Sequence, residues 1–129
     1  MYGYVKVGSA VPKLRVADCV YNKEEILKLV EAAAAKQVRV LSFPELSVTG
    51  YTCADLFFQA PLLHAAEQAI QEIAEATKAL NIFLLIGAPI AVDNQMFNCA
   101  VALYKGKLLG IVPKTFLFLR RAAARARLF

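Results

Sequence analysis

Two charged residues, Glu45 and Lys114, each come at the end of an apolar segment, and together they could carry out proton-transfer chemistry. Glu45 follows the segment 38–43 and Lys114 follows the segment 108–112. In open α/β sheets, ligands and catalytic side chains collect at the carboxyl ends of the strands. If both segments are strands of one parallel sheet, the two side chains emerge at the same edge. There the carboxylate can act as a general base while the ammonium stabilises a developing oxyanion.

The same two residues also admit a purely structural interpretation. Glu45 can be the first polar residue after a strand, solvated in the following loop. A pair with Lys114 would then be a surface salt bridge, worth less than ~1 kcal/mol. Pro113 favours an extended strand end and so fixes where the Lys114 side chain emerges. Spacing and strand position alone leave both interpretations open.

Hydrophobic patterning predicts five strands and two helices that would position these residues. The first helix starts at Asn22, an N-cap with Glu25 three residues on, and the second starts at Pro61, which suits a first turn. The predicted strands are 4–11, 38–43, 82–90, 96–104 and 108–112; the helices run from 22 through the alanine run 32–35 and over 61–80, with a short turn at 55–58. The order βαβαβββ predicts an α/β sheet with helices on one face and a meander at one edge.

Several motifs resemble the carbon–nitrogen hydrolase, or nitrilase, superfamily. Residues 43–51 spell Phe-Pro-Glu-Leu-x-x-x-Gly-Tyr, and residues 113–115 spell Pro-Lys-Thr. Within the superfamily, residues 50–57 are similar to the glutaminase domain of glutamine-dependent NAD synthetases. The segments 6–12 and 86–89 fit the same domain, and the resemblance extends from about residue 2 to residue 117.

The resemblance implies a nitrilase-like αββα sandwich, of which this chain is the N-terminal portion. It assigns the general base to Glu45 and stabilisation of the oxyanion to Lys114. Tyr51, in the loop after Glu45, either lines the glutamine pocket or packs under that loop. The family's nucleophile is a cysteine well after the lysine, and no cysteine follows Lys114 here. Cys53 lies where the family places no nucleophile, so we expect this chain alone to be inactive.

For the parent protein, the resemblance implies a glutamine-dependent NAD synthetase. The glutaminase part would hydrolyse glutamine without a cofactor. The ammonia would pass to a synthetase domain in the same polypeptide, which uses ATP and Mg²⁺ to amidate deamido-NAD. We expect a cytoplasmic homo-oligomer. Two alternatives stay open: another amidase of the superfamily, such as an ω-amidase or a carbamoylase, and a non-catalytic α/β module in which Glu45 and Lys114 merely pair.

The end of the chain departs from the family pattern and carries most of the excess positive charge. We therefore divide the chain into 1–117, the N-terminal part of the hydrolase domain, and 118–129, an atypical tail rich in arginine and alanine. The formal net charge is +5, and four arginines of the tail account for all but +1 of it. Residues 1–117 show no row of basic side chains, so a nucleic-acid partner is not expected.

The remaining reactive side chains indicate no metal site. Cys19, Cys53 and Cys99 show no metal-ligand spacing and are expected to be small buried apolar groups. The lone His64 is expected to be structural or solvated. The longest apolar run, 82–92, is shorter than the ~20 residues of a membrane span, so no membrane partner is expected either.

Overall fold

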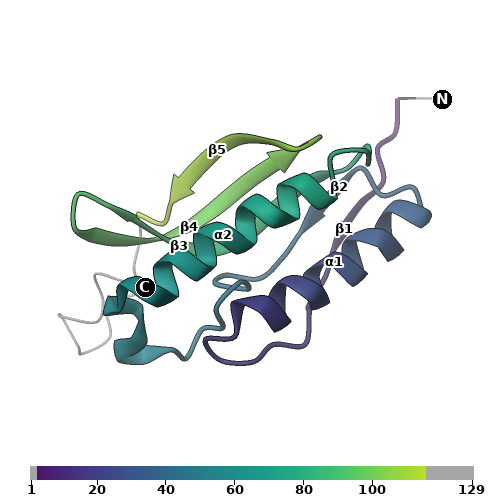
Figure 1. Cartoon of the computed structure of the whole chain (residues 1–129). Helices are drawn as coiled ribbons and strands as arrows, with labels where there is room; N and C mark the ends of the chain where they lie inside the picture. The colour runs from purple at the N-terminus through teal and green to yellow at the C-terminus, as the bar shows by residue number, and fades with distance from the viewer. Residues whose placement is uncertain (1–2, 116–129) are drawn as a thin grey trace.

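A five-stranded mixed sheet, covered on one face by two helices, makes up the part of the protein that the computed structural model describes, residues 3–115 (Figure 1). The elements in chain order are β1 (Val7–Ser9), α1 (Cys19–Ala35), β2 (Val40–Ser42), the 3₁₀ helix η1 (Ala54–Phe58), α2 (Ala60–Ala76), β3 (Phe83–Val92), β4 (Gln95–Tyr104) and β5 (Lys107–Pro113). The strands lie in the sheet in chain order. The predicted α/β class, one-sided helices and edge meander are confirmed. The predicted boundary at residue 117 and the tail 118–129 lie outside the described residues.

Strands β2, β3 and β5 run in the same direction, although the sheet is not fully parallel. β1, β2 and β3 pair in parallel, whereas β4 is antiparallel to both β3 and β5. The chain reverses at residues 93–94 and again at 105–106, where all four residues have positive φ, as tight hairpin turns require. Such short connections join antiparallel strands, so the assumption of one parallel sheet is wrong. The two reversals nevertheless bring the end of β5 to the same edge as the end of β2.

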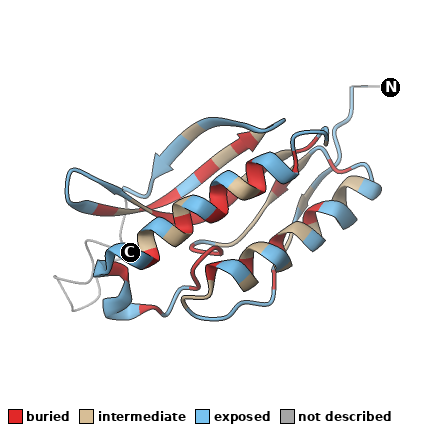
Figure 2. Ribbon diagram, viewed as in Figure 1, coloured by how far each residue is buried: buried red, intermediate tan, exposed pale blue. Residues whose placement is uncertain are grey.

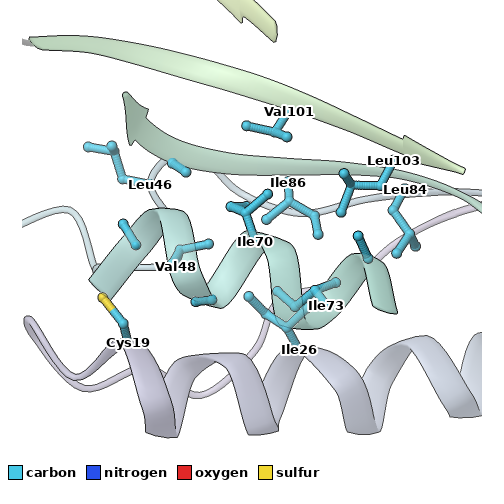
Figure 3. Close-up of a cluster of buried hydrophobic side chains, with 14 of the residues drawn as sticks. Cys19, Ile26, Leu46, Val48, Ile70, Ile73, Leu84, Ile86, Val101 and Leu103 are labelled. Atoms are coloured by element: carbon cyan, nitrogen blue, oxygen red, sulfur yellow. The ribbon is translucent and has the colours of Figure 1, made fainter. Parts of the chain in front are cut away.

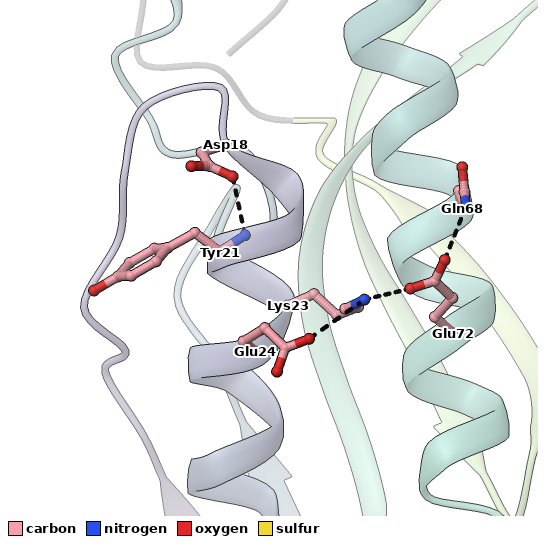
Figure 4. Close-up of polar contacts among 6 residues, drawn as sticks. All are labelled: Asp18, Tyr21, Lys23, Glu24, Gln68 and Glu72. Atoms are coloured by element: carbon pink, nitrogen blue, oxygen red, sulfur yellow. Dashed lines mark hydrogen bonds and ion pairs between the residues drawn. The ribbon is translucent and has the colours of Figure 1, made fainter.

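Helix α1 begins at Cys19, ahead of the predicted cap. The N-cap is Asp18, whose Oδ1 accepts a hydrogen bond from the backbone N–H of Tyr21 at 3.0 Å (Figure 4). Asn22, which was predicted as the cap, is instead fully buried within the helix. Its side chain bonds to backbone atoms of the loop before α1 and of the loop after β2. Asp18 and Asn22 are equally good capping residues by type, and these tertiary hydrogen bonds decide between them.

The ends of the other elements also differ from the prediction, most of all in β1 and α2. β1 pairs over Val7–Ser9 rather than 4–11, because its neighbour β2 offers three residues for pairing. α2 ends at Ala76, and the hydroxyl of Thr77 donates to the carbonyl of Ile73 at 2.8 Å, beside the backbone N–H of the same residue. No helix within residues 3–115 is long and apolar enough to cross a membrane.

The hydrophobic core lies between the helices and the sheet face that they cover (Figures 2 and 3). Ile26 of α1, Ile73 of α2 and Ile86 of β3 are fully buried there. Burying a side chain of this size stabilises the fold by about 1.5–3 kcal/mol. The same cluster includes Val30, Ile70, Leu84, Val101 and Leu103 and, from the loop after β2, Leu46 and Val48. The core therefore also anchors the loop that carries Glu45.

An ion pair ties the two helices together (Figure 4). Lys23 of α1 donates to one carboxylate oxygen of Glu72 on α2 and lies 3.6 Å from Glu24. Gln68 donates to the other oxygen of Glu72 at 2.9 Å. The hydrogen bond to Glu72 raises the pKa of Lys23, and the hydrogen bond from Lys23 lowers the pKa of Glu72. Both groups are therefore charged throughout the neutral pH range.

Candidate active site

Glu45 lies in the loop that follows β2, and hydrogen bonds to β3 hold this loop in place. The backbone N–H groups of Phe43 and Val48 donate to carbonyl oxygens of β3 at 2.9 and 3.2 Å. Leu46 has a φ of 53°, so the chain turns sharply just after Glu45. The glutamate is thereby held beside β3, at the carboxyl edge of the three parallel strands.

The loop approaches β3 so closely that the facing residue, Gly87, has no room for a side chain. A Cβ atom at this position would lie 2.8 Å from the carbonyl carbon of Glu45, and closer still to the oxygen of Pro44 and the nitrogen of Leu46. All three are backbone atoms, which cannot rotate away as the tip of a side chain can. The position of the Glu45 backbone therefore depends on a glycine at residue 87.

Lys114 follows β5 and meets Glu45, as the sequence predicted. Its backbone N–H donates to the carbonyl of Asn98 on β4 at 2.8 Å, which continues the β4–β5 pairing one residue beyond Pro113. Its Nζ donates to Oε1 of Glu45 at 2.7 Å. The two side chains are 37% and 35% exposed, so the pair is partly shielded from solvent and still accessible to a small molecule.

Asn98, which the sequence reasoning missed, is the third polar member of the site. It lies on β4, is 5% exposed, and donates a hydrogen bond from Nδ2 to Oε1 of Glu45. A sequence signal for it does exist: it is the sole amide in the apolar run 96–104. A buried polar side chain needs a hydrogen-bond partner, so its partner could have been sought among the strand ends.

Glu45, Asn98 and Lys114 line one cavity with a volume of about 430 Å³, within the ~300–1,000 Å³ of small-molecule sites. The other lining residues are mostly apolar and come from the end of β2 and from β3, β4 and β5: Phe43, Leu85, Ile86, Gly87, Cys99, Ala100, Val112 and Pro113. An apolar cavity with a carboxylate, an ammonium and an amide at one point can hold a small carbonyl compound. It can also move a proton next to a developing negative charge.

Two other residues considered from the sequence lie outside this cavity. Tyr51 is in the turn at 51–52, is 55% exposed and is not among the lining residues, so its contact with glutamine stays a prediction. His64 is exposed on α2. Within residues 3–115, no three His, Cys, Asp or Glu side chains lie together in a way that could hold a metal ion.

The three cysteines are free and buried, as expected for small apolar groups. Burial raises the pKa of Cys19 to about 11 and also raises the pKa of Cys53 and of Cys99. Cys99 borders the cavity, but it follows Asn98 along β4, so its side chain points to the opposite face of the sheet. At neutral pH these thiols are protonated, and among the described residues none of them forms a hydrogen bond with Glu45.

The sequence matches one family model and several relatives of known activity. The family model described as carbon-nitrogen hydrolase matches residues 6–128. The chain is 33% identical over 115 residues to the glutamine-dependent NAD(+) synthetase of Mycobacterium leprae, and 30% identical over 111 residues to that of Homo sapiens. These matches cover 89% and 79% of this chain but 17% and 16% of the relatives. The chain thus spans a small part of the length of these relatives.

Solved structures share the fold of the described residues. A glutamine-dependent NAD(+) synthetase from Cytophaga hutchinsonii matches with a TM-score of 0.82 and 30% identity, over 88% of this chain and 19% of that chain. An amidase from Nesterenkonia sp. AN1 matches with a TM-score of 0.72 and 21% identity, over 94% of this chain and 48% of the amidase. At that identity the second match concerns the fold alone. A variant of the same amidase carries a covalently added acetamide moiety at its active-site cysteine.

Proposed function

We propose, because this chain belongs to the carbon–nitrogen hydrolase family, that it forms the part of a glutaminase domain that carries the general base, Glu45, and the oxyanion-stabilising cation, Lys114. The reaction is hydrolysis of the side-chain amide of glutamine to glutamate and ammonia. The proposal depends above all on the 2.7 Å hydrogen bond between Lys114 Nζ and Glu45 Oε1 in the lining of the cavity. Similarity to glutamine-dependent synthetases over 89% of the chain supports glutamine as the substrate.

In the first half of the reaction, a cysteine thiol gives its proton to Glu45, and the thiolate attacks the amide carbon. The electron pair of the C=O bond moves to the oxygen, where the ammonium of Lys114 stabilises the negative charge. When this intermediate collapses, the carbon–nitrogen bond breaks and Glu45 passes its proton to the leaving ammonia. In the second half, Glu45 takes a proton from water, which attacks the thioester. Glutamate then leaves, and the proton returns to the sulfur.

The thiol belongs to a cysteine other than Cys19, Cys53 and Cys99. All three are buried and none is hydrogen-bonded to Glu45, so none is placed to give up its proton there. The amidase of Nesterenkonia, which shares the fold, has an active-site cysteine, and this supports a thiol as the nucleophile. We therefore expect no glutamine hydrolysis from the 129-residue chain alone.

The ammonia is proposed to serve an ATP-dependent amidation of deamido-NAD in a synthetase domain of the same polypeptide. The support is the name of the relatives, of which this chain covers about 17%. In this proposal ATP and Mg²⁺ belong to the synthetase domain and not to residues 3–115. The glutaminase step itself uses no cofactor in this scheme. The proposed enzyme is a cytoplasmic homo-oligomer.

The decisive experiment measures glutamate release from glutamine by the protein expressed from its complete coding sequence. We expect Glu45→Gln to lower kcat by ~10²–10⁴-fold and Lys114→Ala by ~10²–10³-fold. Glu75→Gln and Lys78→Ala are matched controls, because they break an exposed carboxylate–ammonium pair near the end of α2, and the rate should not change. Full activity in both site variants would contradict the proposal. Faster hydrolysis of a dicarboxylate ω-amide than of glutamine would replace glutamine with that class of substrate.

A further inference from the structure

Asn98 is the one residue among those described that is bonded to both candidate catalytic residues. Its Nδ2 donates to Oε1 of Glu45, and its backbone oxygen accepts the N–H of Lys114 at 2.8 Å. Asn98 itself is buried on β4, so its side of these contacts is shielded from competing water. A hydrogen bond to a charged group in such a place is stronger than one at the surface.

The strand register explains why Asn98 and Lys114 converge on the same carboxylate. Cys99 pairs with Pro113 in the β4–β5 ladder, so the bond from Lys114 N–H to Asn98 puts these two residues opposite each other at the next position. Side chains of directly opposed residues lie on the same face of a sheet. Asn98 and Lys114 therefore approach Glu45 from the same face.

The two donors converge on one oxygen of Glu45. Both Nδ2 of Asn98 and Nζ of Lys114 bond to Oε1, and within residues 3–115 no hydrogen bond reaches Oε2. A carboxylate with one oxygen fixed in this way presents the other oxygen in a defined direction. Oε2 is then the oxygen that accepts a proton from the nucleophile. An amide suits this task because, unlike a second ammonium or a carboxyl group, it does not change its charge with pH.

We infer that Asn98 is a positioning residue. Its side chain fixes the rotation of the Glu45 carboxylate, so that Oε2 receives the proton, and its backbone carbonyl holds the backbone N–H of Lys114. This inference rests on the proposed function of Glu45 and Lys114. Asn98 acts through these two residues and does not itself contact the reacting atoms.

The first test compares Asn98→Ala with wild type in the complete protein. We expect kcat for glutamine to fall by ~10–100-fold, the loss typical of removing one hydrogen bond to a charged group, with KM changed by less than about threefold. Asn98→Asp, which keeps the shape but places a second carboxylate next to Glu45, should be at least as slow as Asn98→Ala.

Thr77→Val is the control for a merely structural effect. It also removes a buried hydrogen bond, at the far end of α2, and it should lower the melting temperature without lowering kcat. If Asn98→Ala keeps the wild-type kcat, or if Thr77→Val lowers kcat as much as Asn98→Ala does, the positioning role is wrong while the proposed function still stands.

A second test needs no turnover and uses the 129-residue chain. In ¹⁵N–¹H spectra, Glu45→Gln should shift the side-chain amide signals of Asn98, whereas Glu75→Gln should not. If the complete wild-type protein does not hydrolyse glutamine, the proposed function fails, and this measurement still decides whether Asn98 fixes Glu45. Asn98 amide signals that do not respond to Glu45→Gln would overturn the inference.

Discussion

Replacing Gly87 with alanine is expected to displace Glu45 without changing any charged group. The added Cβ would lie 2.8 Å from the carbonyl carbon of Glu45, whereas ordinary contacts begin near 3.4 Å. Relieving that contact takes a separation of about 0.6 Å between β3 and the loop, and relieving the still closer contacts with the oxygen of Pro44 and the nitrogen of Leu46 takes more. Overpacking of this kind costs ~1–3 kcal/mol, and we expect the upper half of that range because the crowded atoms belong to the backbone. Because Glu45 lies in the displaced loop, the same shift would weaken its 2.7 Å hydrogen bond with Lys114.

Urea denaturation of the 129-residue chain measures this loss, and Gly110→Ala provides the matched control. Gly110 lies on β5 with nothing within 4 Å of an added Cβ, so alanine there should be neutral or stabilise by up to ~1 kcal/mol. In the complete protein, Gly87→Ala should also lower glutamine hydrolysis by ~10-fold or more, because the hydrogen bond to Lys114 is weakened. An equal free energy of unfolding for the two alanine variants would refute the close approach of the loop to β3.

Contacts away from the cavity support three further predictions. Asp18→Ala removes the cap on the Tyr21 N–H and should lower the free energy of unfolding by ~1 kcal/mol in urea, whereas Asp18→Asn, which keeps the acceptor, should lose less. The pKa of Glu72 is lowered from 4.5 by Lys23, so its stabilising contribution is present above pH 4.5 and is lost as the pH falls through the folded-state value. The stability difference between wild type and Glu72→Gln should therefore narrow below pH 4.5, and a constant difference would contradict this. With a pKa of about 11, only ~1 in 1,000 Cys19 thiols is ionised at pH 8. Labelling of Cys19 by a thiol-specific reagent should therefore be much slower in the native chain than in the chain unfolded by guanidinium.

The fold was largely predictable because its two helices and the strands β3 and β4 are long, show clear hydrophobic patterns and are separated by polar turns. The α/β class and the likeness to nitrilase-type folds are confirmed by the TM-score of 0.82 with a relative of 30% identity. Sequence patterning could not decide between two residues that are equally suited to the same position. Asp18 and Asn22 both suit an N-cap, and the choice depends on hydrogen bonds from Asn22 to the loop after β2, which is distant in sequence. The length of β1 likewise depends on its neighbour β2.

The candidate site was predictable where a charge ends an apolar strand and not where an amide interrupts one. Glu45 and Lys114 were found because ligands gather at strand ends, and the structure brings the two together. Asn98 was missed because alternation along a strand shows which residues share a face, but not whether that face is buried at a given position. Gly87 was missed as a determinant of the site for a related reason. The need for a glycine there comes from the loop after β2, and nothing in the local sequence of β3 reports the approach of that loop.

The direction of β5 determines whether the candidate base and its cation can meet at all. A charge after a strand is not a sufficient signal, since Lys105 follows β4 just as Lys114 follows β5. Lys105 is seven residues from Asn98 along an extended chain, or about 23 Å, far beyond the ~8–10 Å over which solvent-exposed charges interact at physiological salt. Lys114 reaches Glu45 because a second reversal, at 105–106, turns the chain back toward the edge where β2 ends. The hairpin turns of the meander are therefore a condition for the site, and the two reversals after β3 are what bring Lys114, unlike Lys105, to the candidate base.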